Sequence, residues 1–139
     1  MKRIKIHCSY CGALAIKRPA SYVYGKSAEK GLQLYVCSSY PMCDSYVAAH
    51  KKSGLPMGTL ANKSLRRKRI AAHKSLDNIW KHGYMTREQV YKWLQIKLNL
   101  TEPEMHIGNF NESYCNLLIF ECERAYRNFK FSLKEAVKL

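Results

Sequence analysis

Six cysteines are the residues of this 139-residue chain with the clearest capacity for chemistry. Cys8 and Cys11 form a C-x-x-C pair followed by Gly12, and Cys37 and Cys43 form a second pair with five residues between them. A C-x-x-C turn lets two thiolates reach one ion, and a glycine after it lets backbone N–H groups turn toward the sulfurs. The two pairs together are sufficient for a tetrahedral metal site.

Zinc is the metal that such a ligand set favours, because four thiolates leave no open position for substrate, and iron is the usual substitute. We therefore predict one structural Zn²⁺, with no catalysis at the metal, held by Cys8, Cys11, Cys37 and Cys43. Spacing alone leaves open four independent buried thiols or a redox-active C-x-x-C pair. His7 and His50 are spare ligands by position, although the simpler interpretation is two surface histidines.

The remaining cysteines, Cys115 and Cys122, are seven residues apart in a segment with helical periodicity. Seven residues rise about 10 Å along a helix, so the two thiols cannot chelate one ion together. We expect both to be buried as small apolar groups.

The uneven distribution of cysteines predicts two regions. Gly and Pro in the segment 51–58 interrupt both helix and strand patterns, which indicates a linker between a ribbon at 1–50 and a helical domain at 59–139. In the ribbon, β-favouring residues at 13–17, 21–24 and 32–36 predict the strands of a small antiparallel sheet. The fold class is therefore α+β.

Three helices are predicted in the second region. Apolar residues recur at helical intervals from Leu60 to about His82, where Gly83 stands as a C-terminal cap. Thr86 and Gln89 have the spacing of a capping box for a second helix that ends near Asn99. A third helix is expected to begin after residue 111, and 106–108 is read as a tight turn before it. These helices could close a small bundle.

The charge of the chain points to an anionic partner. Lys and Arg number 24 against 10 Asp and Glu, a net charge of +14. Residues 59–100 carry ten of these basic residues and two acidic ones. Lys63, Arg67, Lys74 and Lys81 would form one stripe on a helix, with Arg66, Lys68 and Arg69 beside it. Such a stripe can track phosphates, although a solvated face that binds nothing would look the same.

Tyrosines are concentrated in the predicted ribbon. Aromatic side chains beside Lys17, Arg18 and Lys26 could stack on exposed bases, or could compensate for a small core. Tyr40 is the preferred contact because it lies in the second cysteine pair. His73 and Asp77 could act in hydrolysis, but carboxylates for a metal-dependent nuclease are scarce. We expect instead a structural network of His73, Asp77 and Arg66.

Two resemblances extend this interpretation. The pair at 37–43, of the form C-S-x-Y-P-x-C, together with 8–12 resembles the zinc ribbons in the C-terminal part of bacterial type IA DNA topoisomerases, although the interval between the pairs is longer here. That resemblance covers residues 6 to 48 and implies a ribbon fold and affinity for single-stranded DNA, but no topoisomerase catalysis.

Over residues 8 to 120 the chain is similar to a family of short zinc-finger-containing proteins of phages and prophages. The residues that carry this similarity are 21–26, 56–62, Leu65, Arg66, Arg69, Ala72, His73, Trp80 and 106–110. This resemblance implies a bacterial or phage setting rather than a mechanism.

The combined prediction is a non-catalytic zinc-ribbon protein that binds nucleic acid, with DNA favoured and single strands possible. One alternative is an interaction module, such as a host-takeover or anti-defence inhibitor, that binds an acidic bacterial protein. A weaker alternative is a nuclease or nuclease accessory. No long apolar segment or signal-peptide pattern is present, so we expect a soluble protein in the cytoplasm of a bacterium or infected host.

Overall fold

The computed structural model describes residues 5–138, with side chains to residue 132, and it divides into two compact units. Unit 1 is residues 1–66 and unit 2 is residues 67–139. Residues 1–4 and 139, at the ends of the predicted ribbon and helical domain, lie outside the described residues. The architecture confirms the predicted α+β class, with a small antiparallel sheet followed by helices.

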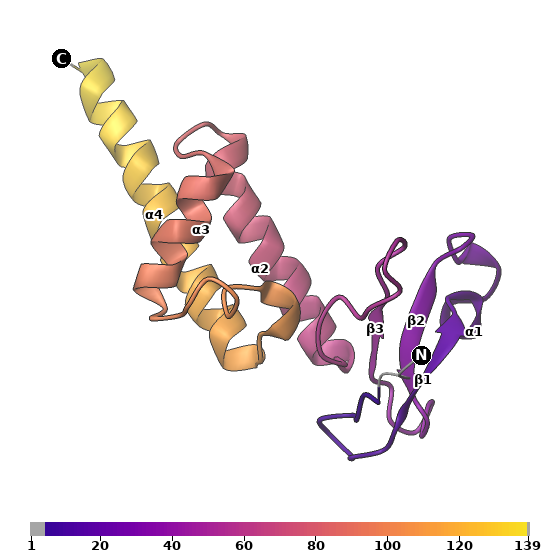
Figure 1. Ribbon diagram of the computed structural model, residues 1–139. Coiled ribbons are helices and arrows are strands. Elements are labelled where there is room, and N and C mark those ends of the chain that lie inside the picture. Colours follow the sequence, from indigo (N-terminus) through magenta and orange to yellow (C-terminus); the bar gives the residue numbers. More distant parts are fainter. Residues whose placement is uncertain (1–4, 139) are drawn as a thin grey trace. The chain divides into compact units, whose positions relative to one another are not determined.

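Unit 1 contains a three-stranded antiparallel sheet in the order β1-β2-β3 (Figure 1). Its strands are β1 (Ala15–Pro19), β2 (Gln33–Cys37) and β3 (Tyr46–Ala48). In the register, Lys17 lies opposite Tyr35, which in turn lies opposite Val47. Because successive side chains on a strand alternate between faces, β2 contributes to a small core on each side of the sheet.

One core cluster lies on the sheet face that carries Tyr35 and Cys37, and the other lies on the face that carries Leu34 and Val36. The buried residues of the first are Cys8, Tyr35, Cys37, Ala49 and Leu60. Those of the second are Ala20, Leu34, Val36 and Tyr46. Neither cluster is large, so unit 1 has little apolar burial with which to stabilise its fold.

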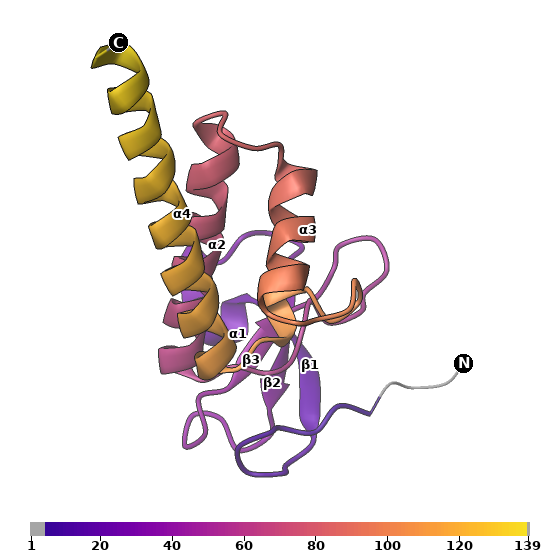
Figure 2. The same ribbon diagram turned by 90° about the vertical axis from the view of Figure 1, so that its left-hand side faces the viewer.

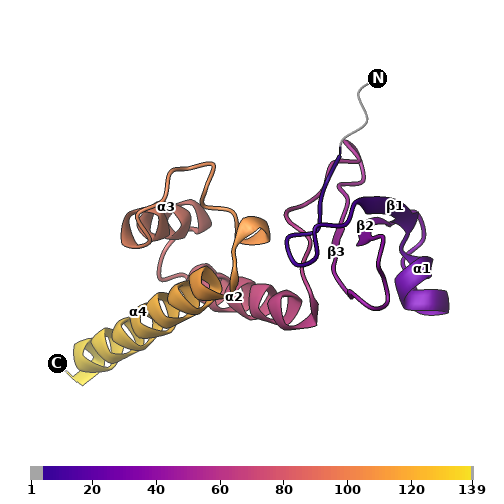
Figure 3. The same ribbon diagram turned by 90° about the horizontal axis from the view of Figure 1, so that it is seen from below.

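The structure corrects one predicted strand. Residues 21–24 form a short helix, α1 (Ser21–Tyr24), which continues into the 3-10 turn η1 (Gly25–Ser27). The carbonyl of Ala20 accepts hydrogen bonds from the N–H groups of Val23 and Tyr24, which turns the chain away from the sheet at the end of β1 (Figure 3). The third strand is β3 instead, a three-residue segment that the sequence patterns did not indicate.

The segment 51–58, predicted as a linker, folds back on the sheet within unit 1. The N–H of His50 donates to the carbonyl of Leu55, and the N–H of Met57 donates to that of Ala48. An isolated bridge joins Ala49 and Pro56. The segment is therefore a hydrogen-bonded loop beside β3.

Unit 2 consists of helices that lie side by side, and α4 runs on past the ends of the other two (Figure 2). The helices are α2 (Lys63–Lys81), whose first turn belongs to unit 1, α3 (Arg87–Lys97) and α4 (Glu112–Lys138). All three were predicted, and the turn η2 (Ile107–Asn109) precedes α4 as expected. No helix within residues 5–138 combines the length and apolar character needed to cross a membrane.

The predicted end of α2 and start of α3 are confirmed, whereas α2 begins at Lys63 rather than at Leu60. The Thr86 hydroxyl accepts from the N–H of Gln89, while the Gln89 side chain accepts from the N–H of Thr86, so the capping box is complete. Gly83 follows α2 with a φ of +77°, a conformation that glycine adopts without strain. These local signals fix where α2 ends and α3 begins.

The core of unit 2 is formed by buried apolar residues of the three helices and of the turn η2. Its fully buried members include Leu76, Ile79, Val90, Leu94, Ile107 and Leu118. Cys115 and Cys122 are buried among them, which confirms their assignment as small apolar groups. Burial raises the pKa of Cys122 to about 12, so this thiol is protonated and unreactive at neutral pH.

Adjacent leucines on α4 test this core. Leu118 is 0% exposed and Leu117 is 51% exposed. Leu118→Ala should lower the free energy of unfolding of unit 2 by about 2–5 kcal/mol, because it removes transfer energy and leaves a cavity. Leu117→Ala, the matched control, should change it by about 0.5 kcal/mol or less. Urea denaturation followed by circular dichroism measures both, and equal losses would contradict the helix orientation.

Candidate metal centre

Four cysteines of unit 1 bring their sulfurs together. The ligand atoms of Cys8, Cys11, Cys37 and Cys43 all lie within 4.8 Å of one another. The Cys8 and Cys43 Sγ atoms are 3.6 Å apart, and those of Cys11 and Cys37 are 3.4 Å apart. A tetrahedral site with Zn–S bonds of about 2.3 Å needs sulfurs about 3.8 Å apart. The four cysteines could therefore bind one zinc ion with small adjustments.

The first pair is positioned by a tight turn. The N–H of Cys8 donates to the carbonyl of Ala13 (2.8 Å), and the N–H of Gly12 donates to that of Cys8 (2.9 Å). Gly12 has a φ of +76°. Burial raises the pKa of the Cys8 thiol, but hydrogen bonds, led by those from the N–H groups of Cys11 and Tyr10, outweigh it and lower that pKa to about 7. The turn thus stabilises a thiolate, which is the form that binds metal.

The second pair begins where β2 ends. The N–H of Tyr40 donates to the carbonyl of Cys37 (2.9 Å), and the N–H of Cys43 donates to that of Ser39 (3.2 Å). Burial raises the pKa of Cys37 to about 12, although the N–H of Ser39 opposes this by donating to its sulfur. A thiol this buried ionises only when a cation compensates its charge. A divalent metal at the centre of the four sulfurs supplies that charge.

No histidine joins this ligand group in the part of the chain that the structure describes. The Nδ1 of His7 lies 3.2 Å from the carbonyl oxygen of Gly12, and His50 lines a cavity formed with Lys17. Cys8 and Cys37 are buried, Cys43 is half-buried and Cys11 is exposed. A set of four sulfur ligands with no water position suits a structural ion.

Comparison with known protein families agrees with this geometry. A family profile described as a zinc-finger-containing domain matches residues 4–125. The chain belongs to this zinc-finger family. The four-cysteine cluster lies within the matched residues, so the family and the geometry point to the same metal. Neither a curated protein nor a solved structure gave a significant match.

Tyrosines and arginines of this zinc-finger protein gather on the sheet face of Leu34 and Val36. We name this set the tyrosine–arginine surface; its members are Arg18, Tyr22, Tyr24, Tyr40, Tyr46 and Arg66. The Arg18 guanidinium lies 4.3 Å from the centre of the Tyr22 ring, and the Tyr22 and Tyr40 rings are 5.8 Å apart. The rings of Tyr24 and Tyr46 are also 5.8 Å apart and nearly perpendicular.

Arg66 is fixed on this surface by several contacts. Its guanidinium donates to the carbonyls of Asp44 and Ala61, both at 2.7 Å, and lies 3.9 Å from the centre of the Tyr46 ring. It also pairs with the Asp44 carboxylate at 3.4 Å. Burial raises the pKa of Tyr46 to about 12, and the hydrogen bond that joins the Tyr24 and Tyr46 hydroxyls adds to this. Arg66 therefore holds the surface together rather than standing free for a phosphate.

The basic residues predicted for α2 have different environments. Lys63, Arg67, Lys74 and Lys81 are exposed. Lys68 is half-buried, and its ammonium donates to the side-chain oxygen of Asn116 (2.8 Å). Arg69 is only 8% exposed, and its Nε donates to the carbonyl of Phe110 (3.0 Å). Arg69 therefore stabilises unit 2 and is not part of the exposed basic surface.

Arg66 does not join His73 and Asp77 in the predicted network. The Asp77 carboxylate accepts a hydrogen bond from the Trp80 indole (2.9 Å), while Arg66 binds Asp44. Desolvation lowers the pKa of His73 more than the attraction of Asp77 raises it. His73 is therefore largely neutral at pH 7. The carboxylate beside it, Asp77, already accepts a hydrogen bond from Trp80.

Metal analysis tests the centre. The purified protein should contain one zinc ion per chain, and Cys37→Ser should lose it together with the amide dispersion of unit 1, because metal binding and folding of this small unit are coupled. Cys122→Ala is the matched control, since it removes a buried cysteine outside the ligand group and should retain the zinc. Full zinc content in Cys37→Ser would contradict the assigned ligands.

Proposed function

We propose that this zinc-finger protein is a non-catalytic nucleic-acid-binding protein, with DNA favoured and single strands as ligand. The observation that carries the proposal is the tyrosine–arginine surface on the sheet face opposite the buried cysteines. Tyr22 is 46% exposed and the Arg18 guanidinium lies over its ring, so an aromatic ring and a cation lie together at the surface. Bases stack on aromatic rings without regard to sequence.

Phosphate contacts would come from the exposed cations. Arg67, Lys74 and Lys81 recur at seven-residue intervals on α2 and are exposed in unit 2. Lys17 is exposed in unit 1. With a net charge of +14, such contacts supply an attraction that is independent of sequence and sensitive to salt. Each unit thus offers its own nucleic-acid contacts.

The sequence resemblances support the same proposal. Similarity to topoisomerase zinc ribbons favours single-stranded DNA as the ligand of the tyrosine–arginine surface. Similarity to short phage and prophage proteins favours the bacterial cytoplasm as its setting. The site proposed for stacking, Tyr40 with Tyr22, lies beside the second cysteine pair, so zinc binding and nucleic-acid binding would be coupled.

A protein partner is the second candidate function. Leu117, Phe120 and Phe131 are exposed on α4, and their spacing places them on the side of the helix opposite Cys115 and Cys122. Exposed apolar residues on one helix face are typical of a protein interface. Capture of partners from bacterial lysate with and without nuclease separates the two functions: one stoichiometric protein that survives digestion would replace our proposal.

Salt dependence tests the phosphate contacts. The logarithm of affinity should fall linearly with the logarithm of salt, by about 0.7 per contact on single strands and 0.9 on duplex. Arg67→Glu with Lys74→Glu should reduce this slope in fluorescence anisotropy. The control is the double variant Lys92→Glu with Lys97→Glu on α3. It reverses the same number of charges and should change the salt slope less. If the two double variants changed the salt slope equally, binding would depend on the net charge of the protein and not on the basic residues of α2.

Stacking is tested by the exposed tyrosine. Tyr22→Ala should weaken single-strand binding by about 1–3 kcal/mol with little change in salt slope, because stacking releases few ions. Tyr22→Phe retains the ring and should bind as the parent does. Anisotropy with one oligonucleotide measures both, and normal binding by Tyr22→Ala would remove the tyrosine–arginine surface from the proposal.

Absence of catalysis is part of the proposal. The four-cysteine site has no position for water, and among the described residues His73 and Asp77 belong to no cluster of the several carboxylates that a two-metal nuclease uses. Incubation with DNA or RNA and Mg²⁺ or Mn²⁺ should therefore give no cleavage above that of a His73→Ala control. Cleavage that this variant abolishes, in protein that is still folded, would favour the nuclease instead.

A further inference from the structure

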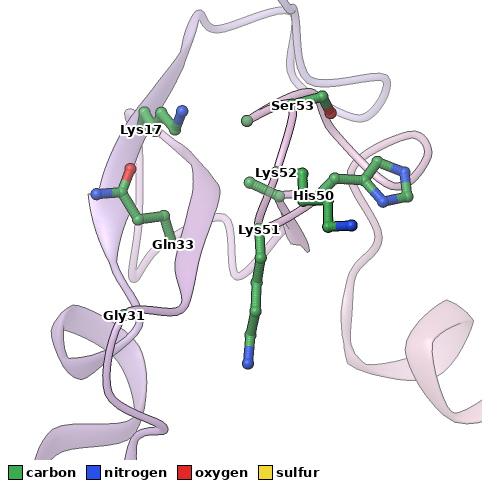
Figure 4. A pocket seen from close by; sticks show the side chains of 9 residues that line it. Lys17, Gly31, Gln33, His50, Lys51, Lys52 and Ser53 are labelled. Carbon is green, nitrogen blue, oxygen red and sulfur yellow. The ribbon is translucent and has the colours of Figure 1, made fainter.

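A cavity in unit 1 carries an unassigned set of cations. It has a volume of about 380 Å³ and lies between Lys17 and Gln33 on the strands and the loop 49–54 (Figure 4). That volume is within the range of about 300–1,000 Å³ typical of small-ligand sites. Its lining includes Lys17, Lys51 and Lys52 and contains no carboxylate. We propose that this cavity binds a terminal phosphate monoester.

Lys17 is held at the cavity by its neighbours. Its ammonium lies 5.7 Å from the centre of the Tyr35 ring, and the Tyr35 hydroxyl donates a hydrogen bond to the carbonyl of Gly54. A Cβ added to Gly54 would lie 2.8 Å from the Lys17 ammonium, so a side chain at this position would displace the flexible end of Lys17. Gly54 also has a φ of +72°, which other residues rarely adopt. The loop and the strand therefore place a cation at the edge of the cavity.

Two of the lysines keep their charge available. Within residues 5–132, neither Lys17 nor Lys52 has a carboxylate within 4.0 Å, whereas Lys51 pairs with Glu29. Lys17 and Lys52 both line the cavity, so an anion bound there would meet lysine side chains whose charge no carboxylate compensates. Charge-assisted hydrogen bonds of this kind are the strong ones in anion recognition.

The loop also offers backbone donors. The N–H of Gly54 donates to the carbonyl of His50 (2.9 Å), which closes a turn. Among the described residues, no protein acceptor is bonded to the N–H groups of Lys51, Lys52 and Ser53. Successive free N–H groups in a turn, next to cationic side chains, form a concave site for an anion with several oxygens.

A terminal monoester fits this site better than a backbone diester. Near pH 7 a phosphate monoester carries a charge of about −1.5 to −2 and offers three oxygens, whereas each backbone phosphate carries about −1. A second hollow shares His50 and the loop to Ser53, and its lining adds the apolar residues Leu32, Leu55 and Met57 together with Glu29, which pairs with Lys51. Apolar lining beside a phosphate site suits a nucleoside attached to the phosphate. The ligand class is therefore a 5′- or 3′-phosphorylated strand end or a free nucleoside monophosphate.

The phosphate site is tested on the zinc-loaded full chain by amide NMR with inorganic phosphate, at constant ionic strength against chloride. Shifts should saturate and concentrate at 50–54 and Gln33. Lys17→Gln and Lys52→Gln should each weaken binding by about three- to tenfold. Lys26→Gln, which removes an equal charge outside the cavity, should not. Absence of saturable shifts, or equal weakening by Lys26→Gln, would overturn the proposal.

The source of the phosphate is tested with oligonucleotides of one sequence that carry a 5′-phosphate, a 3′-phosphate or neither. Preference for a phosphorylated end that Lys52→Gln abolishes, and that Lys26→Gln leaves intact, would assign the cavity to strand ends and make it part of the proposed function. Saturable binding of inorganic phosphate and adenosine monophosphate, with no preference among oligonucleotides, would support the phosphate site and assign it to a free nucleotide. Because the NMR experiment uses no nucleic acid, its result stands even if nucleic-acid binding fails.

Discussion

The convergence of four cysteine sulfurs is the constraint on which unit 1 depends. Two small apolar clusters provide little burial, and Cys37 is buried deeply enough for its pKa to rise to about 12 without a metal. A bound zinc ion would remove the cost of ionising that thiol and would join the first turn to the end of β2. It would also fix the strand register, since a slip of one residue would turn Cys37 to the other face of the sheet.

The two faces of the sheet then serve different purposes. Alternation along β2 places Tyr35 and Cys37 on the metal face, where Tyr35 also holds the loop at Gly54 beside Lys17. Leu34 and Val36 face the other way and support the tyrosine–arginine surface. A single strand thus supports the metal, the cationic cavity and the proposed stacking surface, so any change that disturbs its register should affect all three.

The sequence alone predicted those elements that are specified by residues close to one another in the chain. Cysteine spacing gave the metal ligands, and the pair Thr86 and Gln89 gave the start of α3. The strand assigned to 21–24 is wrong because β-favouring tyrosines there pack as a helical turn against Tyr40 and Tyr46. Arg69 was assigned to the exposed basic surface because of its charge, but it is buried. Its position four residues after Leu65 and three before Ala72 is that of the apolar face. The cavity at 49–54 depends on contacts between Lys17 and a distant glycine, which no local pattern reveals.

Zinc K-edge X-ray absorption of the purified protein tests the central claim most directly, because it reports the ligand atoms themselves. Our account predicts one zinc ion surrounded by four sulfur atoms at about 2.3 Å, the distance typical of thiolate ligands. Nitrogen or oxygen ligands at about 2.0–2.1 Å would show that a histidine, a carboxylate or water completes the site. That result would contradict a closed structural centre built from Cys8, Cys11, Cys37 and Cys43.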